Sequence, residues 1–203
     1  MPCREKVVLL QSEKSDIEKQ NPMIVKDVFS LRKQGRLEPY EDYQAQYDSP
    51  LGEITMTSDG ESLQELRFSD VPFVGITTNL HELHPIPLSI TIFDETRRWL
   101  DCYFRGENPD FTPPIAPFGT LFQRRVWNEL LSIPFGETVT YGDIARHIGC
   151  KSAQAIGGAV GSNPIAIIIP CHRVVGSDGS LTGYAYGLER KRKLLMIEQL
   201  GEL

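Results

Sequence analysis

The sequence predicts two domains, an α/β domain followed by a mainly α-helical domain. Three observations support this division. Near-alternating apolar residues on both sides of a turn at residues 58–61, which contains Asp-Gly, are typical of a β-hairpin. Four prolines gather within residues 106–119, a composition typical of a linker. Beyond them, residues that cap helices recur at Thr120, Thr140 and Ser152, which predicts three helices in succession.

The first half is predicted to contain a polar extension, the hairpin and one helix. The extension is highly charged and its apolar periodicity is weak, so the sequence predicts no role for it. The hairpin spans residues 51–68, and after it Asp94 can cap a helix that Gly106 ends. The predicted boundaries are residues 1–43 for the extension, 44–105 for the N-terminal domain, 106–117 for the linker and 118–203 for the C-terminal domain.

The second half is predicted to be helical. Thr120 and Gln123 have the pattern of a capping box at the start of its first helix, and Pro134 limits that helix. The next two helices are short and lie about four residues apart, a spacing found in helix-turn-helix units with the second helix as the recognition element. Many other α-helical domains share this spacing. Residues 164–170 are expected to be extended, and residues 188–200 to form the last helix.

Length and composition place the chain among ordinary globular proteins. It has 203 residues, of which 40% are hydrophobic and 24% charged. The longest fully apolar stretch, residues 165–169, is much shorter than the roughly twenty residues that span a bilayer. Residues 1–20 mix charges through every apolar run and do not resemble a secretory signal. We therefore expect a soluble, cytoplasmic protein with no membrane partner.

Charge is divided unevenly along the chain. The formal net charge is −6, which by itself argues against a nucleic-acid partner. Residues 118–203, however, hold 9 basic and 7 acidic side chains, whereas residues 1–117 hold 12 basic and 20 acidic ones. A mildly basic second half is compatible with one surface that faces DNA.

Four cysteines are scattered along the chain, and they suggest neither a disulfide nor a metal site. Cys3, Cys102, Cys150 and Cys171 form no CxxC pair and have no ligand-like spacing to a histidine. Disulfides are rare in a reducing compartment, so we expect free thiols, no metal and no cofactor. One of these thiols is a candidate for chemistry.

The strongest local motif is Pro-Cys-His-Arg-Val at residues 170–174, which follows an isoleucine-rich run. An isolated cysteine after such a run is usually buried and inert. Here Pro170 interrupts a strand, so the chain is expected to turn and to expose the thiol of Cys171. His172 and Arg173 bring positive charge beside the sulfur, which favours the thiolate.

A nucleophile of this kind needs a base and a group that orients the base. In an extended chain neighbouring side chains point to opposite sides, so His172 is expected to act on Cys171 through a water molecule. Glu198, in an otherwise apolar part of the last helix, is the candidate for the orienting carboxylate. The alternative, true of most glutamates, is a solvated helix residue.

Residues 170–174 resemble the active-site signature of the O6-alkylguanine-DNA alkyltransferases, also called methylated-DNA–protein-cysteine methyltransferases. Further segments similar to this family, in order along the chain, are residues 134–142, residues 155–159, Asn163 with Pro164, Gly183 with Tyr184, and Glu198. The resemblance covers about residues 118–198, and its ordered motifs make it highly specific. Residues 47–52 resemble, more loosely, the opening of the family's N-terminal domain.

The resemblance implies a ribonuclease H-like N-terminal α/β domain and a winged helix-turn-helix-like motif in the C-terminal domain. It implies a monomer that flips O6-alkylguanine out of double-stranded DNA and transfers the alkyl group once to the protein, with O4-alkylthymine as a minor substrate. The roles that it implies are nucleophile for Cys171, water-linked base for His172, orienting group for Glu198 and turn-forming residue for Asn163. The groups implied to contact the base are the Tyr141 hydroxyl, the main-chain carbonyls of Cys171 and Val174, and the backbone at Tyr184 and Ala185.

The implied DNA contacts fall on the predicted recognition helix, at Ala153, Gln154, Gly157 and Gly158. The two glycines in mid-helix each cost about 1 kcal/mol relative to alanine. Either they let the helix approach DNA closely, or they allow close packing against another helix. Family members usually carry an arginine where this chain has Gln154, so base flipping here lacks a charged contact.

Two other functions are compatible with parts of the pattern. A non-catalytic alkyltransferase-like protein binds lesions without repairing them, but its cysteine position holds a residue that is not a nucleophile, whereas this chain has Cys171. A helix-turn-helix transcription factor with an incidental buried thiol is the second alternative. Transfer of a methyl group to the protein distinguishes the enzyme from both.

Overall fold

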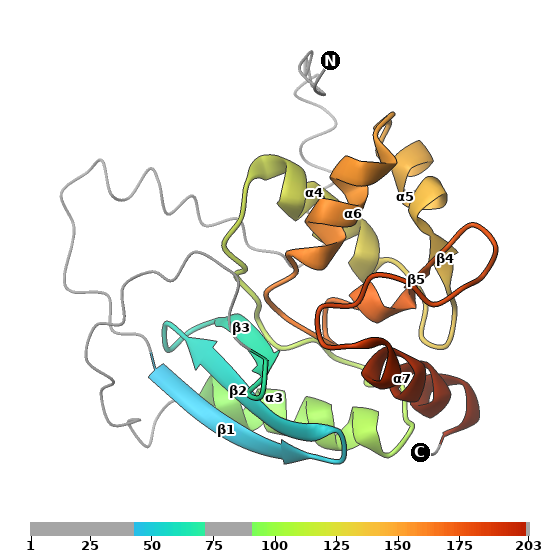
Figure 1. Ribbon diagram of the computed structural model, residues 1–203. Coiled ribbons are helices and arrows are strands. Elements are labelled where there is room, and N and C mark those ends of the chain that lie inside the picture. The colour runs from blue at the N-terminus through green and yellow to red at the C-terminus, as the bar shows by residue number, and fades with distance from the viewer. Residues whose placement is uncertain (1–42, 72–90, 202–203) are drawn as a thin grey trace, which may run out of the picture.

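A computed structural model describes residues 43–71 and 91–201. Its first part is an antiparallel sheet with the strand order β1-β2-β3, and one helix, α3, contacts all three strands (Figure 1). The bounds are Tyr43–Ser49 for β1, Gly52–Ser58 for β2, Leu63–Phe68 for β3 and Thr91–Phe104 for α3. Residues 1–42, most of the predicted extension, lie outside the described residues.

The predicted hairpin is the pair formed by β2 and β3. Ile54 lies opposite Phe68 and Met56 lies opposite Leu66, and all four side chains are fully buried. At the turn, the Asp59 carboxylate accepts hydrogen bonds from the backbone N–H groups two and three residues further on. The sequence did not predict β1 as a strand, because its residues are mostly polar. It forms because its backbone pairs with β2 along its whole length.

Helix α3 differs from the prediction at its start and agrees with it at its end. The helix begins at Thr91, so Asp94 lies in its first turn and is not the N-cap. A carboxylate in the first turn also interacts favourably with the helix dipole. Asp94 therefore indicated correctly that a helix begins nearby, but the helix begins earlier than predicted from an N-cap at this position. At the other end Gly106 has a φ of +76° and donates its N–H to the Tyr103 carbonyl, as in a glycine-terminated helix.

The proline-rich segment after α3 is extended and lies along β3. The Leu63 N–H donates to the Pro114 carbonyl, and the Ala116 N–H donates to the Leu63 carbonyl, both at 2.8 Å. These bonds form a parallel bridge between Leu63 and Ile115. The segment is therefore attached to the sheet as the chain passes to its second part.

The second part of the structure is mainly helical, as predicted (Figure 1). Its helices are α4 at Leu121–Leu131, α5 at Tyr141–His147, α6 at Ala153–Gly161 and α7 at Leu188–Leu200, and its short elements are β4 at Val139–Thr140, η1 at Cys171–Arg173 and β5 at Val174–Val175. Strands β4 and β5 pair in parallel, and α6 packs against both α4 and α5. No helix within the two described ranges is long and apolar enough to cross a bilayer.

The three predicted N-caps are confirmed. The side chains of Thr120, Thr140 and Ser152 each accept a hydrogen bond from a backbone N–H of the first turn that follows, at 3.2, 3.1 and 3.2 Å. Gln123 completes the predicted capping box at α4, and Asp143 completes a second one at α5. These local bonds explain why the helix starts could be placed from the sequence.

Residues 164–170 are not extended as predicted. Only Ile165 forms a bridge, to β3, and the next residues make a tight turn in which the Ile168 N–H donates to the Ala166 carbonyl at 2.7 Å. Ile167 at its centre has a φ of +67°, a left-handed conformation that is costly for a β-branched residue. An apolar run predicts a strand, but here every residue of the run is buried by tertiary packing, which overrides the strand preference.

The two parts of the structure share one hydrophobic core and are joined by backbone hydrogen bonds. The Leu66 N–H donates to the Pro164 carbonyl at 2.9 Å, and the Ala166 N–H donates to the Leu66 carbonyl at 2.8 Å. The edge of the sheet therefore holds the tight turn that precedes residue 170.

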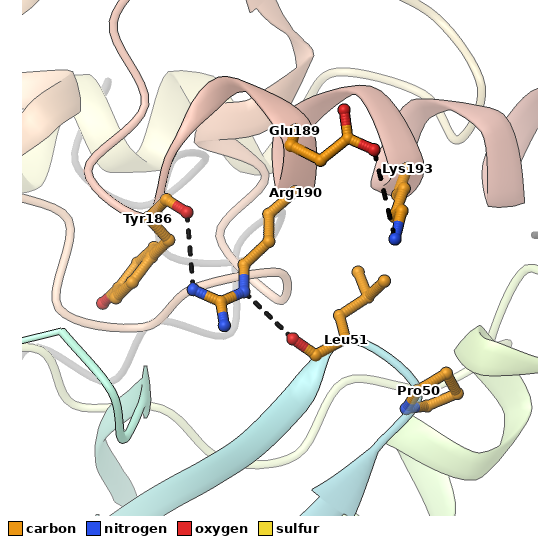
Figure 2. A pocket seen from close by; sticks show the side chains of 6 residues that line it. All are labelled: Pro50, Leu51, Tyr186, Glu189, Arg190 and Lys193. Atoms are coloured by element: carbon orange, nitrogen blue, oxygen red, sulfur yellow. Dashed lines mark hydrogen bonds and ion pairs between the residues drawn. The ribbon is translucent and has the colours of Figure 1, made fainter.

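A side chain of α7 provides a second connection between the parts. Arg190 reaches across a shallow hollow to the turn between β1 and β2, where its Nε donates to the Leu51 carbonyl at 3.0 Å (Figure 2). The same guanidinium pairs with Asp70 at 2.7 Å and lies 4.4 Å from the centre of the Phe68 ring. The start of α7 is thus fixed to the sheet.

Candidate active site

Cys171 is the first residue of η1, the single turn that follows Pro170. The prediction that this turn exposes the thiol is wrong, because only 6% of the residue is accessible. The chain does turn at Pro170, but it turns the cysteine into the hydrophobic core. The sulfur lies 3.1 Å from the side-chain nitrogen of Asn163, which donates to it.

Asn163 is buried and holds the segment before the cysteine. Its Nδ2 also donates to the Ile169 carbonyl at 2.8 Å, and its Oδ1 accepts from the Ile165 N–H at 3.0 Å. Asn163 follows Ser162, the C-cap of α6. One amide group therefore links the end of α6, the tight turn and the thiol.

The surroundings of the thiol differ from the prediction that His172 and Arg173 favour its ionisation. Burial raises the pKa of Cys171, while the hydrogen bond from Asn163 and the positive charge of Lys191 lower it. His172 and Arg173 both pair with Glu198 instead. The resting side chain is a neutral thiol, so a thiolate has to form during a reaction.

Glu198 is the centre of a buried hydrogen-bond network. Its Oε1 lies 2.6 Å from His172 Nε2 and accepts from Tyr103 Oη at 2.8 Å and from Arg173 Nη2 at 3.1 Å. Its Oε2 accepts from Arg173 Nε at 2.8 Å and from the Gly136 N–H at 3.0 Å. Burial opposes ionisation of Glu198, but the bonds from His172 and Arg173 outweigh it and lower its pKa to about 2. The alternative of a solvated glutamate is excluded.

His172 is held in one orientation by this carboxylate. Because an ionised carboxylate can only accept hydrogen bonds, the His172 nitrogen that faces Glu198, Nε2, carries a proton. Burial lowers the pKa of His172, although the contact with Glu198 opposes this, so the ring is neutral and its lone pair is on Nδ1. Among the described residues Nδ1 has no hydrogen-bond partner. This nitrogen is therefore able to accept a proton.

Two residues of the site, Lys191 and Tyr103, were missed by the sequence reasoning. Lys191 is fully buried, and its ammonium group donates to the carbonyls of Val174 and Thr182. It stands in a run of basic residues that looks like a solvated helix surface. The available signal was helical spacing, because Lys191 lies seven residues before Glu198 on the same face of α7. For Tyr103 the sequence offered no signal beyond its place on the apolar side of α3.

Aromatic residues lie beside the network. Tyr184 is buried with its ring centre 6.5 Å from that of His172, and the ring of Tyr186 packs against Tyr184 at 5.5 Å. Tyr141, at the start of α5, donates its hydroxyl hydrogen to the Gly183 carbonyl at 3.3 Å. Ala185, between the two packed tyrosines, is exposed. Three of the predicted base-contacting residues therefore lie in or beside residues 183–186, a segment whose Tyr184 ring packs beside His172. They are Tyr141, Tyr184 and Ala185.

The predicted DNA-contacting residues share the outer side of α6. Ala153, Gln154 and Gly158 are exposed and Gly157 is partly exposed. A Cβ atom added to either glycine would meet no described atom within 4 Å. The alternative that these glycines serve close packing between helices is therefore excluded.

Comparison with known proteins places both parts of the described chain in one family. Residues 43–117 match the family model for the ribonuclease-like domain of 6-O-methylguanine DNA methyltransferase, and residues 121–200 match that for its DNA-binding domain. The chain is 44% identical over 163 residues to the methylated-DNA–protein-cysteine methyltransferase of Methanosarcina acetivorans, covering 77% of this chain and 97% of the relative. It is 42% identical over 160 residues to that of Haemophilus influenzae, covering 78% of this chain and 87% of the relative.

A solved structure gives the same result. The crystal structure of Mycobacterium tuberculosis OGT in complex with DNA matches with a TM-score of 0.68 at 42% identity, over 79% of this chain and 94% of that one. The predicted order of a β-sheet domain followed by a helical DNA-binding domain is confirmed at this level. The chain belongs to the 6-O-methylguanine DNA methyltransferase family.

Proposed function

We propose that the protein repairs O6-alkylguanine in double-stranded DNA by transferring the alkyl group to the sulfur of Cys171. The observation that carries this proposal is the buried thiol in contact with Asn163 and followed by a histidine whose partner is an ionised glutamate. A regulator with an incidental thiol needs no such network. A lesion-binding relative without activity needs no nucleophile at this position.

The network supplies the chemistry that this transfer requires. His172 Nδ1 takes the proton of the Cys171 thiol through a water molecule, and Glu198 stabilises the positive charge that the ring gains. The thiolate then attacks the alkyl carbon, so the S–C bond forms while the bond from carbon to guanine O6 breaks. The proton lost by the thiol balances the proton that the released guanine gains. The thioether is not hydrolysed, so each molecule acts once.

Access to the lesion requires base flipping, because O6 of a paired guanine faces into the duplex. Rotating the nucleotide out costs a few kcal/mol. Helices α5 and α6 act as a winged helix-turn-helix-like unit in which the outer side of α6 contacts DNA. There the bare backbone at Gly157 and Gly158 allows close approach, and Gln154 fills the gap left by the flipped base.

In this proposal the flipped base contacts Tyr141 and the backbone of the residues that follow Pro170. The Tyr141 hydroxyl exchanges its contact with the Gly183 carbonyl for one with the base. The carbonyls of Cys171 and Val174 accept from the exocyclic amine, since a carbonyl oxygen has a second lone pair beyond its present bond. The backbone at Tyr184 and Ala185 closes over O6. O4-alkylthymine is a minor substrate, and the protein works as a monomer on cytoplasmic DNA without a cofactor.

The decisive experiment is a mass measurement. The protein is mixed with a duplex oligonucleotide that carries one O6-methylguanine, and its intact mass and peptide map are recorded. We expect the gain of one methyl group, located on the peptide that contains Cys171. Lesion binding without a mass gain would indicate a non-catalytic protein, and binding that depends on DNA sequence alone would indicate a regulator.

A further inference from the structure

The catalytic network receives one of its members from the first part of the chain. We propose that Tyr103, on α3, is a positioning residue for methyl transfer: its hydroxyl fixes the Glu198 oxygen that orients His172. This inference rests on the proposed function and adds a residue to it. It also gives the N-terminal part of the chain a direct share in the reaction.

The contacts place the Tyr103 hydroxyl at the junction between the base and its carboxylate. It donates to Glu198 Oε1 at 2.8 Å, and it lies 3.4 Å from His172 Nε2, which contacts the same oxygen. The tyrosine is fully buried and its ring stands edge-on to the His172 ring, at 80° and 6.4 Å between centres. Both the orientation of the carboxylate and the position of the imidazole therefore depend on this side chain.

Packing alone does not explain a tyrosine here. A phenylalanine would fill the same space with no hydroxyl to bury, whereas a buried hydroxyl needs a partner. The carboxylate has other donors: His172, two nitrogens of Arg173 and the Gly136 N–H. These donors satisfy the Glu198 carboxylate without Tyr103. The effect of the Tyr103 hydroxyl is therefore on the strength of the hydrogen bond between Oε1 and His172.

The backbone around the pair is fixed where two helices end. Tyr103 lies three residues before Gly106 in α3, and Glu198 lies three residues before Gly201 in α7. Both glycines have left-handed φ values, +76° and +75°. A Cβ atom added to Gly106 would come within 2.4 Å of the Gly201 Cα, so the two chain segments touch. This contact sets the distance between the last turns that carry the two side chains.

The charges around His172 determine whether loss of the Tyr103 hydroxyl raises or lowers the pKa of His172. The groups that face the network are Tyr103 from α3, Cys171 and Arg173 from η1, Lys191 and Glu198 from α7, and Tyr184 from the segment before α7. A hydrogen bond from Tyr103 takes up part of the negative charge on Oε1. Without it Glu198 interacts more strongly with protonated His172, so the pKa of His172 rises. Since only neutral His172 accepts the thiol proton, the acid limb of the rate profile moves to higher pH.

The test compares two tyrosine variants of the full chain. Tyr103→Phe removes the hydroxyl bond to Glu198, and Tyr47→Phe removes an equally short one, 2.8 Å to Asp101, elsewhere in the same part of the chain. The rate of methyl transfer from duplex DNA is measured in single turnover across the acidic and neutral range. We expect Tyr103→Phe to be about tenfold slower at neutral pH, the size of one hydrogen bond to a charged group, with its acid limb at higher pH. Tyr47→Phe should match the unmodified protein.

The outcomes separate this inference from the proposed function. No transfer by the unmodified protein would overturn the proposed function. Transfer by the unmodified protein with the same rate and pH profile in Tyr103→Phe would overturn the inference, as would a loss that is uniform at every pH. The nitrogen NMR shifts of the His172 ring report its titration without any turnover. An unchanged titration in Tyr103→Phe would also overturn the inference.

Discussion

The buried network around Glu198 and the outer side of α6 are built in opposite ways. In the network one carboxylate accepts hydrogen bonds from three side chains and one backbone group, and all four side chains are buried. On α6 three of the four residues predicted to contact DNA are alanine or glycine, Gln154 is exposed, and the space beside Gly157 and Gly158 is open. The reaction centre is therefore assembled before any substrate arrives. The proposed DNA surface on α6, by contrast, makes its contacts only when DNA binds.

The largest expected effect comes from removing the nucleophile. Cys171→Ala should abolish methyl transfer and keep the binding of lesion DNA, because the DNA contacts that we propose lie on α6. Transfer is followed with a radiolabelled methyl group, and binding with a labelled duplex. Cys3→Ala, Cys102→Ala and Cys150→Ala are the matched controls and should retain transfer. Residual transfer in Cys171→Ala would mean that another residue accepts the methyl group.

The next effect concerns the stability of the network. Folding lowers the pKa of Glu198 from 4.5 to about 2, so within this range the unfolded chain binds a proton that the folded chain does not. The contribution of ionised Glu198 to the free energy of unfolding is complete above about pH 4.5 and is lost as the pH falls toward 2. A shift of this size corresponds to about 3 kcal/mol. Urea unfolding at several pH values measures it.

Glu198→Gln provides the comparison for that measurement. The variant should lose roughly 3 kcal/mol at neutral pH, the usual cost of leaving a buried charge without its partner. It should also show a weaker decline of stability in acid, since the titrating carboxyl is gone. An equally steep decline in the variant would place the acid-sensitive group elsewhere.

On α6 we expect a smaller effect, in which a substitution stabilises the fold and weakens DNA binding. Gly157→Ala should raise the free energy of unfolding by about 1 kcal/mol, because alanine favours the helix and has room. The added methyl group holds the backbone away from DNA, so affinity should fall about tenfold, or roughly 1.4 kcal/mol. Thermal unfolding and DNA titration measure the two changes. Transfer from the free O6-methylguanine base, which needs no DNA surface, should be unchanged and serves as the control.

The smallest effect concerns Gln154, the residue that we propose fills the gap left by the flipped base. Gln154→Arg should speed transfer from duplex DNA by a few-fold and steepen the salt dependence of binding by about one counterion. Gln154→Lys is the matched variant that adds the charge without the planar donor group. Equal rates for Gln154→Arg and the unmodified protein would show that the glutamine already suffices. The free-base reaction should be the same in all three proteins.

The sequence by itself determined the features that depend on near neighbours. The caps at Thr120, Thr140 and Ser152 and the glycine end at Gly106 are bonds within a few residues, so their signals are local. The β2–β3 hairpin follows from alternation around a turn. The motif around Cys171 pointed to the family, and the resemblance made Glu198 the candidate partner of His172.

Only the tertiary structure decided what surrounds the thiol. The position of the charges depends on how α7 and α3 dock beside η1, so the charge of Lys191 lowers the pKa of Cys171 while Arg173 pairs with Glu198. For the same reason Glu198 is buried, and Tyr103 enters the network although it lies far from Glu198 in the sequence. Burial of the run before Pro170 turned an expected strand into a strained turn. Contacts between distant residues leave no periodic pattern in a single chain, and so packing decided them.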